Sequence, residues 1–442
     1  MTRRFFLLPA LLLLLGACRN EPRMTPCESQ IAAAVEAVSI DSVRTYIDEL
    51  VAFQTRHTLS SQSDPSRGIG AAVAYLAGRC ERWAEGAAPG RPRPRVETVR
   101  YPVGRNGGRY DRVTEVPELM VTLPGTKAER EILLVAHIDT RVRDVMDSTA
   151  FAPGADDNGS GLACLLEAVR ILSGIPLEQT VRCLFVSGEE QGLDGSRHFA
   201  DLAKQEGWPV VAVFNNDMIG NVRASGTELR EDHKVRVFSE SRSGEDSDSR
   251  QLARYVKEAA ARYVPDQEVV LNYRSDRYRR GGDHLPFLQN GFTAVRVCEY
   301  CEDYERTHQD VRTEDGIAYG DLADYVDFPY LVRNIRVNIA AAASLAMAPG
   351  KPERALLANA MELDNNTVIT WEPVADPDVS YQVLCRETSD AEWLPALPTG
   401  DSGIVPAGAP LRFSCPLSKD NYYFAVRAIA PGGCPGLPAV AR

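Results

Sequence analysis

The chain has 442 residues, which is enough for two or three domains, and its 44% hydrophobic and 25% charged content is that of a globular protein. This composition excludes a mostly disordered, collagen-like or coiled-coil chain. The 61 acidic residues outnumber the 49 basic ones and give a net charge of −12. A nucleic-acid-binding surface is basic, so we expect no nucleic-acid partner.

The chain begins with the pattern of an export signal. Arg3 and Arg4 precede an apolar run over residues 5–15, and small residues follow it. This run has 11 residues and is too short to span a bilayer core, which needs about 20. No other stretch of the sequence is long and apolar enough to do so.

The end of this segment, Leu15-Gly16-Ala17-Cys18, resembles a bacterial lipobox. The resemblance implies that Cys18 is lipidated and that the protein is anchored to a lipid bilayer of the bacterial cell envelope, at the outer membrane, in the periplasm or at the cell surface. An ordinary cleaved signal with an incidental cysteine is the alternative. We therefore predict a signal peptide over residues 1–18 and a tether over residues 19–36.

The middle of the chain alternates between helical and strand patterns. Apolar residues at helical spacing predict helices over residues 40–51, 70–83, 161–172 and 249–263. Continuous apolar runs predict buried strands over residues 132–136, 181–186, 210–214 and 293–297. This alternation predicts an α/β domain over residues 37–347, with a mostly parallel sheet and helices on both faces.

The C-terminal region has a different periodicity. After a linker over residues 348–352, alternating patterns predict short strands over residues 367–371, 381–386 and 422–429. We therefore expect a small all-β sandwich over residues 353–442 that folds independently. The spacing of Trp371, Tyr381 and Tyr422 resembles that of a fibronectin type III domain.

Metal-ligand residue types follow the predicted strands. In an open α/β sheet, ligands bind beyond the carboxyl ends of the strands, so these side chains should meet in one crevice. Each type alone is usually structural or solvated, but five groups in this arrangement are difficult to explain without a site. The groups are His137-Ile138-Asp139, Asp156-Asp157, Glu189-Glu190, Asn216-Asp217 and His308.

These residues supply the ligands of a two-metal hydrolytic site. Such a site needs a bridging carboxylate, a histidine and a carboxylate for each metal, and one further carboxylate as general base. We assign Asp156 as the bridge and Glu189 as the base. His137 and Asp217 then bind one metal, and His308 and Glu190 bind the other.

These motifs resemble metallopeptidase family twenty-eight, the co-catalytic dizinc aminopeptidases of the bacterial leucyl aminopeptidase type. The resemblance covers residues 40–345 and implies two Zn²⁺ per chain with the ligands assigned above. It also implies that Asp139 orients His137 and that the Asp156–Asp157 peptide is cis. The motifs that carry it are Pro153 to Gly161, Gly188 to Ser196, Asn216 to Gly220, Gly282-Asp283-His284 and His308-Gln309-Asp310, together with His137 to Thr140.

The chain departs from this family at the substrate-binding loops. It has Gly282 before Asp283, where the family often has serine, so a hydroxyl that would support the metal ligands from behind is missing. Tyr278 lies near the position of a tyrosine that steadies the oxyanion in some members. Arg279, Arg280 and Arg296 could face a substrate carboxylate. The candidate substrate contacts are Tyr278, Asp283 and Arg296.

The cysteines carry a separate expectation. Ten cysteines are too few for a disulfide-dense scaffold but allow a few bridges in an oxidising compartment. Cys298 and Cys301 have the spacing of a redox or zinc pair, but no second pair accompanies them. We therefore expect a structural disulfide between them.

We expect a lipid-anchored zinc exopeptidase that acts on peptides, and an aminopeptidase in particular. A carboxypeptidase or dipeptidase on the same fold is the second possibility, favoured if the arginines hold a C-terminal carboxylate. The third is an inactive relative that serves as a binding or adhesion lipoprotein. Glutaminyl cyclases share the fold that this resemblance implies but use one zinc ion. The metal content therefore distinguishes a glutaminyl cyclase from a two-zinc peptidase.

Overall fold

The computed structural model describes residues 24–86, 92–104, 108–241, 244 and 246–442. The predicted signal peptide and Cys18 lie outside the described residues. Across the described part of the chain, no helix combines the length and the apolar composition needed to cross a membrane.

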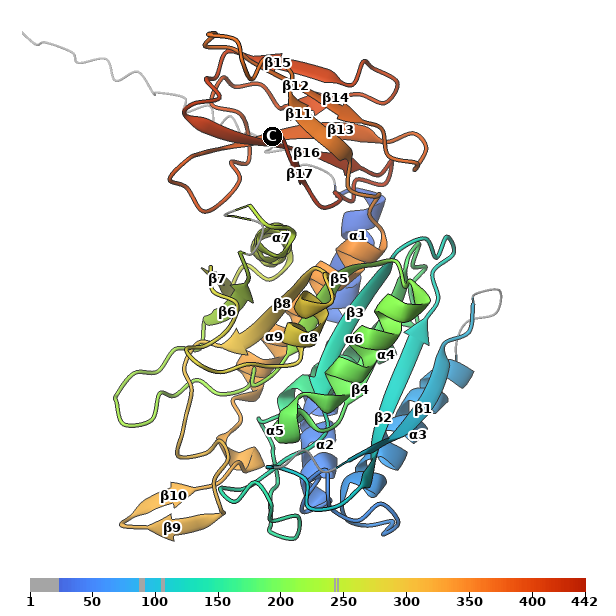
Figure 1. The fold of residues 1–442 in the computed structure, drawn as a ribbon, viewed down its shortest axis with the longest axis vertical. Helices are drawn as coiled ribbons and strands as arrows, with labels where there is room; N and C mark the ends of the chain where they lie inside the picture. Colours follow the sequence, from blue (N-terminus) through green and yellow to red (C-terminus); the bar gives the residue numbers. More distant parts are fainter. Residues whose placement is uncertain (1–23, 87–91, 105–107, 242–243, 245) are drawn as a thin grey trace, which may run out of the picture.

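An eight-stranded sheet forms the centre of the larger domain, in the order β1-β2-β4-β3-β5-β8-β6-β7 (Figure 1). Strands β4, β3, β5 and β8 run parallel, while β1 and β2 are antiparallel additions at one edge. At the other edge, β6 is antiparallel to β8 and parallel to β7. The strands are β1 (Arg95–Val103), β2 (Thr114–Leu123), β3 (Glu131–His137), β4 (Thr180–Val186), β5 (Val210–Asn216), β6 (Lys234–Ser239), β7 (Glu268–Asn272) and β8 (Ala294–Glu299).

Alternate residues of a strand point to opposite faces of the sheet. Both sets are apolar in the central strands, so helices cover both faces. Ile132, Leu134 and Ala136 face the larger core, which contains residues of α1 to α4, α7 and α9. Leu133 and Val135 face a smaller core that α6 and α8 close. The helices are α1 (Pro26–Glu36), α2 (Ile40–Ala52), α3 (Ile69–Glu85), α4 (Gly159–Leu172), α5 (Glu189–Gly192), α6 (Asp194–Glu206), α7 (Asp248–Tyr263), α8 (His284–Gln289) and α9 (Phe328–Ala346).

The predicted α/β fold class is therefore confirmed. Each of the four predicted buried strands is present, as β3, β4, β5 and β8. Between β8 and α9 the chain adds a small hairpin, β9 (Arg312–Glu314) with β10 (Ile317–Tyr319), and a 3-10 turn, η1 (Ala323–Tyr325).

The predicted tether is partly wrong, because most of its described residues form helix α1. Thr25 and Glu28 make reciprocal bonds at its N-terminus, which is a capping box. Ile31 and Val35 are buried in the larger core. Cys27 forms a disulfide with Cys434 near the other end of the chain.

The C-terminal region is an antiparallel β-sandwich with a core of its own, as predicted. Trp371 and Tyr381 pack in this core with ring centroids 5.4 Å apart, and Phe424 is buried beside them. The two sheets have the orders β11-β12-β15 and β14-β13-β16-β17. Their strands are β11 (Glu353–Leu357), β12 (Thr367–Glu372), β13 (Ser380–Glu387), β14 (Ile404–Val405), β15 (Arg412–Cys415), β16 (Tyr422–Ile429) and β17 (Ala439–Val440).

Buried polar contacts and the disulfide attach the sandwich to the α/β domain. Asp246 accepts two 2.8 Å hydrogen bonds from Arg386 of β13 and one of 2.7 Å from Arg254 of α7. Arg427 of β16 forms an ion pair with Glu258 of α7. Figure 1 shows the sandwich at the opposite end of the molecule from α5 and the β9–β10 hairpin.

The expected Cys298–Cys301 disulfide is absent, since both cysteines are free and buried. Cys298 lies in β8 and packs against Met218 and Phe238. The only disulfide among the described residues joins Cys27 to Cys434 instead.

Candidate metal centre

The strand-end residues meet in one pocket, as predicted from the sheet topology. The pocket has a volume of about 350 Å³ and opens beyond the carboxyl ends of β3, β4 and β5. The residues that line it all lie between Arg109 and His308, so the sandwich contributes none of them. Five of its acidic and histidine residues form two groups that share one carboxylate.

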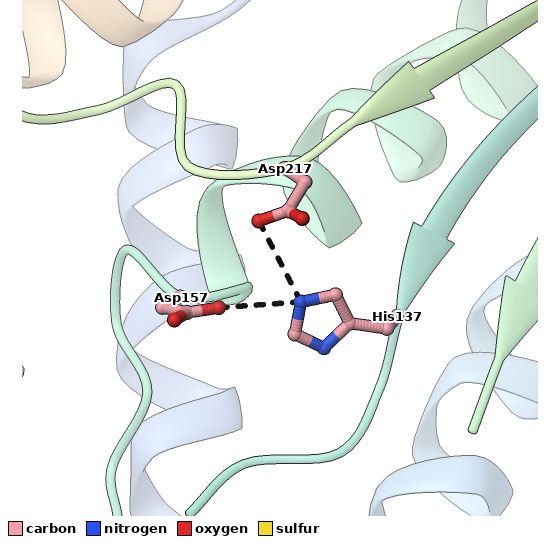
Figure 2. Close-up of side chains that lie close together, drawn as sticks. All are labelled: His137, Asp157 and Asp217. Carbon is pink, nitrogen blue, oxygen red and sulfur yellow. Dashed lines mark ion pairs between the residues drawn. The ribbon is translucent and has the colours of Figure 1, made fainter. Parts of the chain in front are cut away.

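The first group consists of His137, Asp157 and Asp217 (Figure 2). His137 ends β3, and Asp217 follows β5 on the neighbouring parallel strand. The Nε2 atom of His137 lies 3.2 Å from Asp157 Oδ1 and 3.7 Å from Asp217 Oδ1. All three side chains are buried, so their charges are poorly solvated without a cation.

The second group consists of Asp157, Glu190 and His308. The Nε2 atom of His308 lies 3.0 Å from Asp157 Oδ2 and 2.8 Å from Glu190 Oε1. The two oxygens of Asp157 therefore face different histidines, which is the arrangement of a bridging carboxylate.

The structure corrects the predicted bridge from Asp156 to Asp157. Asp156 Oδ1 turns away and accepts a 2.8 Å hydrogen bond from the Gly220 backbone N–H. The Asp321 carboxylate accepts hydrogen bonds from the backbone N–H groups of both aspartates and so holds this turn. The cis peptide is likewise one residue further along, between Asp157 and Asn158.

The charges of the two groups are strongly interdependent. Burial alone would raise the pKa of Asp157, but His137 and His308 hold it well below its usual value. Burial likewise opposes protonation of His308, yet Glu190 and Asp157 raise its pKa to about 10.

His137 is oriented by a backbone atom. Its Nδ1 lies 3.0 Å from the backbone oxygen of Asp139, whereas the Asp139 carboxylate lies 3.8 Å away. A proton on Nδ1 that is donated to this oxygen leaves the lone pair of Nε2 facing Asp157 and Asp217. The predicted orienting role of Asp139 is thus carried by its main chain.

The Asp139 carboxylate holds the Glu189-Glu190 turn instead. It accepts hydrogen bonds from the backbone N–H groups of Glu189 and Glu190, at 3.3 and 3.0 Å. Glu190 points to His308, while Glu189 lines the pocket with part of its surface exposed. Burial and the nearby carboxylates of Glu190 and Asp217 raise the pKa of Glu189 well above its usual value. This pair therefore has two different environments, as the sequence predicted.

Arg141 makes the second group different from the first. Its Nε donates to Glu190 Oε2 at 2.8 Å, and its Nη2 lies 2.6 Å from His308 Nδ1. A guanidinium has only donors, so it favours a proton on Nε2 of His308, the atom that faces the carboxylates. A metal at this group must displace that proton and compete with Arg141.

The three candidate substrate contacts do not line the pocket. Tyr278 has 71% of its surface exposed to solvent, and Asp283 is buried. Arg296 is also buried and forms ion pairs with Asp217 at 3.0 Å and Asp276 at 3.3 Å. Arg296 therefore holds a ligand carboxylate and does not face substrate.

The missing serine at Gly282 has a physical explanation in this arrangement. A Cβ atom at Gly282 would lie 2.8 Å from Arg296 Nη1 and 3.1 Å from Asn215 Nδ2. The Arg296 guanidinium thus occupies the space that a serine side chain would need.

Sequence reasoning missed three residues at this site. Asp157 is adjacent to the predicted bridge, while Asp321 and Arg141 were not singled out at all. The position of Arg141, two residues after Asp139, was the available signal for its role. No local pattern marked Asp321, because its contact with residues 156 and 157 spans more than 160 residues.

The donor set of the two groups fits zinc. Imidazole nitrogens and carboxylate oxygens are common zinc ligands at about 2.0 to 2.2 Å, which places the donors roughly 3.3 Å from one another. The observed separations of 2.8 to 3.7 Å between histidine and carboxylate atoms agree with this spacing. The fold and the site together define an α/β protein with a candidate site for metal ions.

Comparisons with known proteins agree with this class. The model of peptidase family M28 matches residues 118–327. A probable zinc metalloprotease from the fungus Leptosphaeria maculans is 37% identical over 420 residues, covering 91% of this chain and 94% of the relative. A probable zinc metalloprotease from Pyricularia oryzae is 37% identical over 430 residues, covering 92% and 83%. The chain belongs to peptidase family M28.

A solved structure supports the fold. The LapA aminopeptidase of Legionella pneumophila is 21% identical and matches with a TM-score of 0.53, over 74% of this chain and 78% of that one. The similarity to the fungal relatives extends well beyond residues 118–327, so the match is not confined to the metal centre.

Proposed function

We propose that the protein is a zinc-dependent exopeptidase that removes N-terminal residues from peptides with two zinc ions. The observation that carries this proposal is Asp157, whose two oxygens face His137 and His308 within one pocket. A carboxylate between two histidine–carboxylate groups is the arrangement that a two-metal hydrolase requires.

The ligand groups and the base have separate tasks. His137 and Asp217 would hold one ion, His308 and Glu190 would hold the other, and Asp157 would be shared between them. Zinc bound here would supply Lewis-acid chemistry, lowering the pKa of a water molecule and polarising the scissile carbonyl.

Glu189 is the proposed general base. It lines the pocket but belongs to neither ligand group. Its raised pKa makes it a better proton acceptor than an ordinary glutamate. Glu189 accepts a proton from the attacking water and delivers it to the nitrogen of the leaving group.

The test compares a short peptide that has a free N-terminus with its N-acetylated form. The zinc-loaded protein should cleave the first at the N-terminal bond and lose activity on the second, and a chelator should abolish the reaction.

Cleavage of the acetylated peptide at its C-terminal bond would instead support a carboxypeptidase. That second candidate is favoured by the arginines at the pocket. Failure to cleave either peptide with zinc bound would support a non-catalytic binding protein.

We also propose that the protein is exported and held at a membrane through lipidated Cys18. The disulfide between Cys27 and Cys434 supports an oxidising compartment. A Cys18→Ser variant should move from the membrane fraction to the soluble fraction. Retention of this variant in salt-washed membranes would contradict the anchor.

A further inference from the structure

Five arginines line the metal pocket. They come from three separate parts of the chain, and four carboxylates line the same pocket. The arginines are Arg109, Arg141, Arg277, Arg279 and Arg280, and the carboxylates are those of Asp157, Glu189, Glu190 and Asp217.

Most of these arginines already have partners. Arg141 pairs with Glu190, as described above. Arg277 and Arg280 both form ion pairs with Glu302, at 3.1 and 2.8 Å. Arg109 donates a hydrogen bond to the backbone oxygen of Glu190.

Arg279 differs from these residues. Within the described part of the chain it has no ion pair or hydrogen bond, and its guanidinium lies over the face of the exposed Tyr278 ring. The side chain is exposed at the pocket. A guanidinium in this state keeps all five of its donors available for a ligand.

The backbone at Arg279 is also unusual. Its φ of 56° is in the left-handed region, which residues with a side chain adopt only at a cost. Leu193, Met218 and His308 line the same pocket with φ of 65°, 59° and 57°. Strained residues therefore gather around this pocket, as they do at binding sites.

The charge of the pocket depends on its metal. The five guanidinium groups equal in number the four lining carboxylates and Glu302 together, and each bound zinc ion would add two positive charges. A metal-loaded pocket is therefore cationic. It attracts an anionic substrate group and repels a second cationic one.

We propose that this site selects peptides that carry a carboxylate within one residue of the scissile bond, and that Arg279 is the main determinant of this preference. This inference rests on the proposed peptide hydrolysis. Guanidinium and carboxylate groups form bidentate, charge-assisted hydrogen bonds, which explains why arginines and not lysines line the pocket. The carboxylate has two possible sources: an acidic side chain at the N-terminal residue or the free C-terminus of a dipeptide.

The experiment measures kcat/KM of the zinc-loaded full-length protein on two matched pairs. Ala-Phe and Ala-Phe amide test the C-terminal carboxylate, whereas Glu-Phe amide and Gln-Phe amide test the acidic side chain. We expect a preference of about tenfold to a hundredfold for the carboxylate in one pair, as for one charged hydrogen bond. The pair that shows it identifies the source.

The variant Arg279→Gln should reduce this preference to threefold or less, and added salt should weaken the preference in the wild type. The matched control is Arg274→Gln. Arg274 is an exposed neighbour that also contacts Tyr278 but does not line the pocket, and its variant should retain the preference.

Hydrolysis of both members of each pair at equal rates, or an unchanged preference in Arg279→Gln, would overturn the inference and leave the proposed function intact. If no peptide is cleaved, the proposed function fails. Equilibrium binding of the same pairs then decides the inference. Equal affinity within both pairs, or affinities that Arg279→Gln does not change, would overturn it.

Discussion

At the scale of single residues, Glu189 and Glu190 are neighbours with separate roles. The Glu189→Gln variant keeps the size of the side chain but cannot accept a proton from water. We expect kcat to fall by about 10² to 10⁴ while the zinc content stays near that of the wild type. Steady-state kinetics and metal analysis on the same sample test this.

The matched variant is Glu190→Gln, which alters a ligand of the second group and should deplete one zinc ion. If Glu189→Gln kept wild-type turnover, or lost zinc as Glu190→Gln does, the division of roles within this pair would be wrong.

The two adjacent aspartates give a second residue-scale prediction. Asp157→Asn removes a negative charge from between His137 and His308, so the occupancy of both metals should fall. Asp156→Asn should retain both metals, because an amide oxygen can still accept the hydrogen bond from Gly220. Equal metal loss in the two variants would contradict the bridge at Asp157.

The adjacent aspartates also show a limit of sequence reasoning. The residue types and their order locate the site, since strand ends converge in any sheet of this kind. They do not decide which aspartate faces the metals, because that depends on how residues 156–158 turn. Asp321, far along the chain, holds this turn through the backbone N–H groups of both aspartates.

At the scale of elements, buried strands were predictable because their apolar runs are continuous. Residues 132–136 are fully buried between helices on both faces, and no polar position interrupts them. Helix α1 was missed because it is short and lies within the segment predicted as a tether. Its signals were Thr25 and Glu28 at capping-box spacing and Pro26 at the first helical position.

The disulfide of α1 gives a prediction at this scale. Cys27 and Cys434 are 407 residues apart, so their bond restricts the unfolded chain over nearly its whole length. Cys27→Ser should lower the free energy of unfolding by about 2 to 5 kcal/mol. Denaturant titration measures this change. A reducing agent should weaken the wild type to a similar extent and leave the variant unaffected. Equal stability of variant and wild type would show that the disulfide contributes little.

At the scale of the whole molecule, Asp246 is central to the docking of the sandwich. Its carboxylate is shared by Arg386 of the sandwich and Arg254 of the α/β domain. Burial raises the pKa of Asp246, but these two arginines overcome the effect and hold it below the usual value. The stabilisation is therefore present above the unfolded pKa of about 4 and is lost as the pH falls through the lower folded value.

Asp246→Asn should remove this pH dependence. The variant leaves two buried guanidinium groups without their anion, so we expect a loss of about 3 kcal/mol in the free energy of unfolding at pH 7. The difference between wild type and variant should shrink toward pH 3. Denaturant titrations across this range measure it, and a difference that does not change with pH would contradict the assigned ion pairs.

The sandwich itself was predictable as a fold but its attachment was not. Alternating residues such as those of β13 and β16 identify strands with one buried face. The contacts of Arg386 and Arg427 with residues of the other domain leave no pattern in the sequence, because arginine is also common on free surfaces.

The zinc content of the purified full-length protein is the most direct test of a two-zinc centre bridged by Asp157. We predict two zinc ions per chain by mass spectrometry. The His137 group should fill before the His308 group, because Arg141 contacts both the carboxylate and the histidine of the second group, whereas Arg296 contacts only Asp217 in the first. Asp157→Asn should bind markedly less zinc at both groups. A wild type that saturates at one zinc per chain, or an Asp157→Asn variant that still binds two, would contradict the account.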